Sequence, residues 1–306
     1  MTMQDSDLIV NEILESYKKH DLTRRIDPKA TINRDKVIEI VETMRRILFP
    51  GFFAENKAKS EYLTYIVGER VEFVHYHLRK QIYNALCSNP ECGCPECSCM
   101  ERAEEITCLF LKKVPEIREY LYTDVIAAYD GDPAAYSTDE IIFSYPGLFA
   151  ITIYRMAHEL FLLDVPMIPR IMTEYAHNLT GIDIHPGASI GKYFFIDHGT
   201  GIVIGETTVI GSNVKIYQGV TLGALSTRKG QQLKGVKRHP TLGNYVTIYS
   251  GTSVLGGETV IGDGATIGGN AFIVESVPAG TKVSVKNPEL QFSGGNNQEL
   301  TQNNNW

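Results

Sequence analysis

The chain has 306 residues, enough for one large domain or two ordinary ones. Its hydrophobic content of 43% and charged content of 21% exclude a largely disordered protein. A formal net charge of -7 argues against a nucleic-acid-binding protein, which usually carries a basic face, and gives no reason to expect an anionic membrane as partner.

The N-terminal stretch MTMQDSDLIV is acidic and lacks the basic and apolar regions of a secretion signal. No apolar run approaches the roughly 18 residues that a membrane-spanning helix needs. We therefore expect a cytoplasmic protein without a membrane partner.

Residues 1–180 have the spacing of helices. The segment 35–49 repeats its apolar residues with helical periodicity, and segments 61–86, 101–129 and 145–162 behave likewise. Turn-forming residues interrupt the pattern at Pro50-Gly51 and along 88–99. Helices with short connections predict a helical bundle as the first domain.

All six cysteines lie between positions 87 and 108, which is not the dispersed framework of a secreted disulfide protein. Cys94 and Cys97 form a CxxC pair, and four thiolates are able to hold zinc or an iron-sulfur centre. The alternative is a loop of reduced thiols, since a second well-spaced CxxC pair is missing from the sequence. We assign no metal site and retain Cys94 and Cys97 as the pair to examine.

From Gly181 onward an aliphatic residue recurs every six positions, often followed by Gly. This period is typical of a β-helix in which three short strands complete one triangular coil. Stacking of the coils buries the inward aliphatic residues. The predicted fold class is α+β, with this domain at 181–285 and a flexible tail rich in Gly, Asn and Gln at 286–306. The repeating residues are Ile184, Ile190, Ile196, Ile204, Ile210, Ile216, Leu222, Leu242, Ile248, Val254, Ile261, Ile267 and Ile273.

The repeat is interrupted at three places. Two extra residues precede Ile204, a basic insertion occupies 223–240, and one extra residue precedes Ile261. Insertions in repeat proteins form loops, commonly on the working face. The first interruption contains Asp197-His198. Histidine titrates near neutral pH and suits a general base, so the interruption favours a functional over a purely structural role for His198.

Several motifs carry a resemblance to a known family. The segments DIHPGASIG, DHGTGIVIGETTVIG and RHPTLG, with DGDPAAYST and YPGLFAITIYRMAHEL before them, resemble the hexapeptide-repeat acyltransferases and, within them, the serine O-acetyltransferases. The resemblance extends over about residues 120–285.

The resemblance implies a left-handed parallel β-helix and a homotrimer, or a dimer of trimers, with acetyl-CoA in the groove between neighbours. It implies direct transfer of the acetyl group to the hydroxyl of L-serine, which yields O-acetylserine and CoA on the route to cysteine. Acetyl-CoA would be a co-substrate, and no cofactor would stay permanently bound.

The family motifs also imply roles for individual residues. The histidine of the DH motif falls on His198, the general base, and the aspartate of DIHP falls on Asp183, which would orient it. Asp197 and Asp132 match the two aspartates that would meet the serine ammonium group.

The RHP motif places Arg238 and His239 at the serine carboxylate. Glu206 matches a supporting glutamate, and Gly223 and Ala224 are expected to contact acetyl-CoA. A zwitterionic amino acid requires anionic groups at one end and a cationic fork at the other, which agrees with these residue types.

Two other functions remain open at this point. One is a CoA-dependent acyltransferase for another small hydroxyl or amine, and the other is a non-catalytic hexapeptide scaffold. The joint presence of Asp183, His198 and Arg238 argues against the scaffold. The tail ends in Trp306, whereas family members insert a C-terminal Ile into O-acetylserine sulfhydrylase, so we do not expect that partner to bind.

Overall fold

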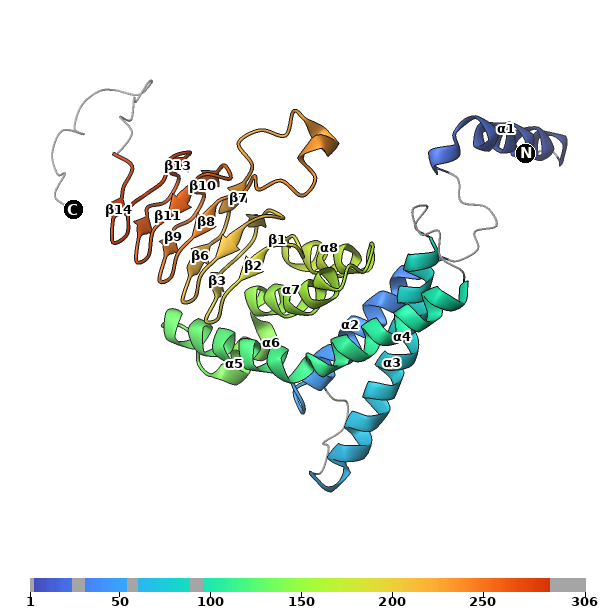
Figure 1. Ribbon diagram of the computed structural model, residues 1–306, viewed down its shortest axis with the longest axis horizontal. Helices are drawn as coiled ribbons and strands as arrows, with labels where there is room; N and C mark the ends of the chain where they lie inside the picture. The colour runs from blue at the N-terminus through green and yellow to red at the C-terminus, as the bar shows by residue number, and fades with distance from the viewer. Residues whose placement is uncertain (1–2, 24–30, 54–59, 89–95, 287–306) are drawn as a thin grey trace, which may run out of the picture.

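A computed structural model describes residues 3–23, 31–53, 60–88 and 96–286. Figure 1 shows helices at one end of the molecule and a stack of short strands at the other. The predicted order of a helical region followed by a parallel β-helix of hexapeptide repeats is confirmed.

The helical region contains α1 to α8 within the described residues. Three of the segments expected from the sequence correspond to α2, α3 and α7, whose buried faces carry the predicted apolar residues. The helices are α1 Met3–Lys19, α2 Arg34–Leu48, α3 Leu63–Cys87, α4 Glu96–Lys112, α5 Val114–Gly131, α6 Thr138–Ser144, α7 Pro146–Leu162 and α8 Ile168–Thr180. Three 3₁₀ turns are η1 Asp21–Thr23, η2 Ser60–Tyr62 and η3 Gly230–Leu233.

The segment 101–129, which has helical spacing throughout, is divided between α4 and α5. The chain breaks at Lys113 because Pro115 lies in the first turn of α5, where its missing amide hydrogen costs nothing, whereas the same residue inside a helix would lose a hydrogen bond and clash. Helix α4 also begins at Glu96, within the segment assigned to a loop.

The strands form three parallel sheets, ordered β1-β4-β7-β10-β13, β11-β8-β5-β2 and β14-β12-β9-β6-β3. The register pairs the repeating aliphatic residues with one another, as in Ile184 with Ile204 and Ile196 with Ile216. The strands are β1 Asp183–Ile184, β2 Ser189–Ile190, β3 Phe195–Asp197, β4 Val203–Ile204, β5 Val209–Ile210, β6 Lys215–Tyr217, β7 Thr221–Gly223, β8 Thr241–Leu242, β9 Thr247–Ile248, β10 Ser253–Leu255, β11 Val260–Ile261, β12 Thr266–Ile267, β13 Phe272–Ile273 and β14 Lys282–Val283.

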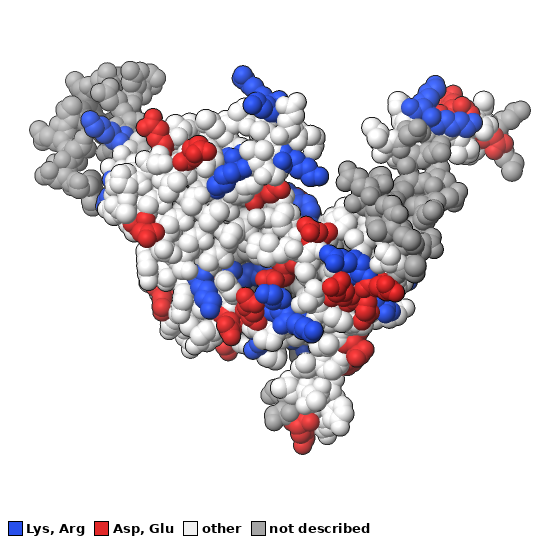
Figure 2. Space-filling view, in the orientation of Figure 1, with Lys and Arg blue, Asp and Glu red and all other residues white. Residues whose placement is uncertain are grey.

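The interruptions leave this register intact. Leu222 pairs with Val254 across the 223–240 insertion, so the insertion leaves the wall as a loop between β7 and β8. The loop projects from the β-helix in Figure 1, and Figure 2 shows Lys and Arg side chains gathered on it. The interruptions therefore add surface features without disturbing the aliphatic core.

Parts of the sequence prediction lie outside the described residues. They include the tail beyond Lys286 and hence Trp306, so the expectation about O-acetylserine sulfhydrylase stays a prediction. Among the helices that the structure describes, each is too short or too polar to cross a bilayer. The cytoplasmic location expected from the sequence also stays a prediction.

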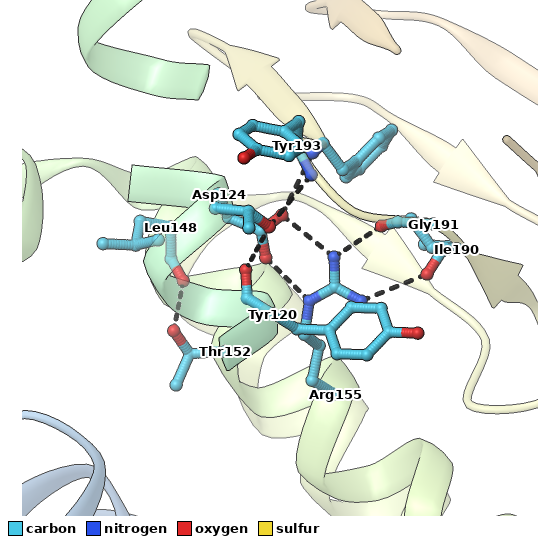
Figure 3. A network of polar contacts seen from close by, with 10 residues as sticks. Tyr120, Asp124, Leu148, Thr152, Arg155, Ile190, Gly191 and Tyr193 are labelled. Carbon is cyan, nitrogen blue, oxygen red and sulfur yellow. Dashed lines mark hydrogen bonds and ion pairs between the residues drawn. The ribbon is translucent and has the colours of Figure 1, made fainter. Parts of the chain in front are cut away.

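A buried ion pair attaches the helices to the first coil. The Arg155 guanidinium of α7 binds Asp124 of α5 through two hydrogen bonds of 2.7 and 2.9 Å. It also donates to the carbonyl oxygens of Ile190 and Gly191, at 3.1 and 2.8 Å, and Asp124 accepts from the amide of Phe194 at 3.0 Å. Figure 3 shows this network between α5, α7 and the corner after β2.

The Arg155→Met variant should be strongly destabilised, since it leaves the Asp124 carboxylate buried without its partner. Removing one member of a buried pair typically costs ~3–5 kcal/mol. Arg102→Met is the matched control, because Arg102 pairs with Glu105 on the exposed face of α4, where such a pair contributes about 0.2–0.5 kcal/mol. Urea denaturation compares the two, and equal losses of stability would contradict this account.

Candidate active site

The first interruption of the repeat projects His198 from the wall. His198 follows β3 and has a backbone φ of 60°, a left-handed conformation that is uncommon for residues other than glycine. Its side chain is 73% exposed, and its Nε2 atom lies 3.6 Å from Oδ1 of Asp197. The imidazole is therefore accessible to a substrate and has a carboxylate beside it.

Lys215 holds the other oxygen of Asp197. Its Nζ lies 3.2 Å from Asp197 Oδ2 and donates a 2.6 Å hydrogen bond to the carbonyl oxygen of Gly131 at the end of α5. The ammonium group also lies 4.8 and 4.7 Å from the ring centroids of Phe195 and Tyr217. These contacts fix the Asp197 carboxylate next to the C-terminus of α5.

Asp132 caps the C-terminus of α5 and lies at the same edge of the β-helix as His198. It accepts hydrogen bonds from the Tyr145 hydroxyl at 2.6 Å and from the Ala134 amide at 2.8 Å. The Tyr145 hydrogen bond is the main reason why the pKa of Asp132 lies below its ordinary value, and the charges of Lys215 and His198 add to this. Burial and the Asp132 carboxylate raise the pKa of Tyr145 to about 12, so the phenol remains a donor.

The structure thus gathers three of the predicted site residues, Asp132, Asp197 and His198, at one edge. Sequence reasoning missed Lys215 and Tyr145. A signal for Lys215 was present, because a long basic side chain precedes Ile216 in a repeat whose outward positions are mostly small.

A second group surrounds the end of the 223–240 insertion. Arg238 forms an ion pair with Glu206. The Thr207 hydroxyl accepts from the backbone amides of Arg238 and His239, at 2.9 and 3.1 Å, and the Thr207 amide donates to His239 Nδ1 at 3.0 Å. Thr207, a residue that sequence reasoning also missed, therefore ties the insertion to the corner after β4.

His239 is neutral at physiological pH. It is 7% exposed, and burial, followed by the charge of Arg238, lowers its pKa to about 4. Because Nδ1 accepts from an amide, the proton of the neutral ring lies on Nε2. His239 thus offers a hydrogen-bond donor, while Arg238 supplies the positive charge.

Asp183, expected to orient His198, lies on β1. In the described chain its Oδ1 contacts Nη1 of Arg170 on α8 at 3.1 Å, and Arg170 also binds Glu174 at 2.5 Å. The carboxylate beside His198 is that of Asp197, and the orienting role of Asp183 stays a prediction.

Gly223 ends β7 and, together with Ala224, opens the 223–240 insertion, so the residues expected at acetyl-CoA lie on the same edge as Arg238. Cys94 lies outside the described residues. Cys97 belongs to the first turn of α4, and its side chain is also outside the description.

The two groups occupy different edges of the prism. His198 lies at the corner between the β3-containing and β1-containing sheets, and Arg238 at the corner between the β1-containing and β2-containing sheets. The β1-containing sheet separates them within one chain. His198, the predicted base, and Arg238, which is predicted to bind the serine carboxylate, therefore face two different directions.

A hexapeptide β-helix with a histidine and carboxylates at one edge and an arginine fork at another is the architecture of an acyltransferase. No protein-family model matches the chain. It is 44% identical over 273 residues to "Serine acetyltransferase, plasmid" of Synechococcus elongatus, a match that covers 86% of this chain and 85% of that protein. The chain belongs to the serine acetyltransferase family.

Solved structures agree with this assignment. Serine acetyltransferase 1 of Entamoeba histolytica, determined with L-cysteine, aligns with a TM-score of 0.70 at 36% identity over 83% of this chain and 87% of that one. The soybean serine acetyltransferase, determined with serine, aligns with a TM-score of 0.53 at 29% identity over 84% and 98% of the two chains. The resemblance inferred from the sequence is confirmed.

The Gly205→Ala variant should lose stability, because a Cβ atom at Gly205 would lie 2.1 Å from the His239 ring. Overpacking of this kind typically costs about 1–3 kcal/mol. Gly68→Ala is the control, since Gly68 lies within α3 with nothing within 4 Å of the added carbon and should gain stability. Thermal unfolding compares the two variants. An unchanged unfolding temperature in Gly205→Ala would show that the His239 ring is not confined against Gly205.

Acidification should destabilise the protein partly through His239. Its folded pKa of about 4 lies below the ordinary 6.5, so between these values the unfolded chain binds the proton more readily and stability falls as pH falls. In His239→Asn the loss of stability between pH 6.5 and 4 should be smaller than in the parent. Unfolding midpoints measured across this range test the prediction, and parallel pH profiles would exclude it.

Proposed function

We propose that the chain transfers the acetyl group of acetyl-CoA to the hydroxyl of L-serine, a step of cysteine biosynthesis, with His198 as the general base. Membership of the serine acetyltransferase family carries this proposal. The exposed imidazole that the interrupted repeat projects is its structural support.

The edge that contains His198 suits the ammonium end and the hydroxyl of serine. Asp132 and Asp197 supply negative charge beside the imidazole, which leaves the serine hydroxyl facing a base. His198 would accept the hydroxyl proton while the serine oxygen bonds to the thioester carbon. The C–S bond then breaks, and the CoA sulfur leaves with its electron pair and takes up a proton.

The edge that contains Arg238 suits the serine carboxylate. The guanidinium offers five N–H donors, and the Glu206 ion pair together with a 3.1 Å hydrogen bond to the Leu233 carbonyl oxygen uses only part of them. Because its ring is neutral, His239 would donate a hydrogen bond to the serine carboxylate without competing with Arg238 for its negative charge. Glu206 then acts by positioning Arg238, in agreement with the supporting role expected for it.

The separation of the two edges supports a site shared between chains. One serine molecule cannot reach both edges of a single prism around the β1-containing sheet. In the cyclic trimer that we propose, the His198 edge of one chain would lie against the Arg238 edge of its neighbour. Acetyl-CoA would lie in the same groove near Gly223 and Ala224, and a dimer of trimers would contain the same groove.

His198→Ala should reduce kcat by about 10²–10⁴-fold, the usual contribution of a general base, while acetyl-CoA binding is retained. His20→Ala is the control, because His20 is an exposed residue beyond α1. Release of CoA at saturating serine measures the loss. Activity of His198→Ala within a few-fold of the parent would remove His198 from the mechanism.

Arg238→Ala should raise the KM for serine by about 10–100-fold, because hydrogen bonds between charged groups contribute about 1.5–3 kcal/mol. Arg228→Ala, an exposed arginine of the same insertion, should leave this KM unchanged.

A subunit-mixing experiment then tests the shared site. When His198→Ala and Arg238→Ala chains are unfolded together and reassembled, about a quarter of the interfaces in a random equal mixture would contain both natural residues. Activity well above that of either variant alone supports the shared site. Activity no higher than the average of the two variants places both groups in one chain's site.

A further inference from the structure

Three metal-ligating side chains converge between α3 and α4. His75 Nε2 lies 2.8 Å from Oε1 of Glu104, and the Cys108 thiol lies 3.6 Å from the same oxygen. The Cys108 sulfur lies 4.0 Å from His75 Nε2. All three donor atoms thus fall within 4.8 Å of one another, and each residue is half-buried.

Helix geometry accounts for this convergence. Glu104 and Cys108 are four residues apart on α4, so they share one face of that helix, and His75 reaches the same point from α3. The C-terminal half of α3, which carries its buried residues, packs against α4 (Figure 1). Arg79 donates to the second carboxylate oxygen of Glu104 at 3.0 Å and so turns Oε1 towards the other two ligands.

The donor atoms already approximate the spacing of a tetrahedral site. Zinc bound at about 2.0–2.3 Å by nitrogen, oxygen and sulfur places its ligands roughly 3.3–3.8 Å from one another. The three distances bracket this range, so small side-chain rotations are sufficient.

We propose that His75, Glu104 and Cys108 form a zinc site that joins α3 to α4. The metal would bind His75 Nε2, Glu104 Oε1 and the Cys108 thiolate, with water as the fourth ligand and release of the thiol proton. Imidazole and thiolate select zinc over magnesium or calcium, which prefer oxygen ligands. The site lies on the helical region and is separate from both edges of the β-helix.

This site differs from the Cys94-Cys97 pair that the sequence suggested. It also differs from a second convergence of Glu174, His177 and Asp183. An arginine contacts the carboxylates of both groups, Arg79 in the first and Arg170 in the second, but a thiolate is missing from the three ligands of the second group. The second group is therefore the weaker candidate and serves as an internal control.

The experiment uses the full chain with Cys94→Ser and Cys97→Ser, so that the CxxC pair cannot contribute. The reduced protein is stripped with a chelator and titrated with Co²⁺, whose visible absorption reports tetrahedral coordination and whose thiolate charge-transfer band reports sulfur ligation. We expect one Co²⁺ per chain with a thiolate band, displaced by Zn²⁺, and an unfolding temperature that rises with Zn²⁺ concentration.

Cys108→Ser should abolish the thiolate band, and His75→Gln should weaken Co²⁺ binding at least tenfold. Glu174→Gln and Cys87→Ser, which remove a ligand of the second group and another half-buried thiol, should leave both signals unchanged. If Cys108→Ser fails to fold, His75→Gln and Glu104→Gln provide the test. A thiolate band that survives Cys108→Ser, loss of binding in Glu174→Gln, or absence of the band in the CxxC-free parent would each overturn the proposal.

Discussion

The buried Arg155–Asp124 ion pair determines where the candidate active site is built. A buried pair is tolerable only when its remaining hydrogen-bonding groups are satisfied, and here two carbonyl oxygens and one amide of the first coil complete it. Both partners come from helices whose ends reach the His198 edge: α5 ends beside Asp132, and α7 begins beside Tyr145. The ion pair therefore holds residues of α5 and α7 against an edge of the β-helix, although these residues are not adjacent to that edge in the sequence.

The regularity of the β-helix explains why its functional groups lie at corners. Aliphatic residues of successive coils occupy the interior in register, so a polar side chain there would be buried without partners. The strands of the flat sheets are only two or three residues long, so each strand offers few outward positions. Extra residues can be accommodated only where the chain turns, and both interruptions that carry candidate site residues lie at such turns. The candidate functional groups of this fold are consequently found at its edges.

Much of the fold was predictable because its determinants are local. The six-residue period fixed the strands and their register, and the slip at Asp197-His198 identified an exposed histidine. Pro115 was visible in the sequence, and a stricter use of its geometry would have divided the helix at Lys113. Lys215 and Tyr145 were not predictable in this way. Their roles depend on contacts with residues far away in sequence, such as the Lys215 bond to the Gly131 carbonyl oxygen, 84 positions apart.

The charges of the two edges explain how each stays stable before substrate binds. At one edge Lys215 balances Asp197, and at the other Glu206 balances Arg238. Each charged group is thereby held in place by a partner of its own chain, and under the proposed function we expect little reorganisation on binding. A zwitterion that lies between the edges would add its ammonium to the acidic side and its carboxylate to the basic side. In the proposed shared site charge would set the orientation of this zwitterion, and its hydroxyl would face His198 in only one of the two possible alignments.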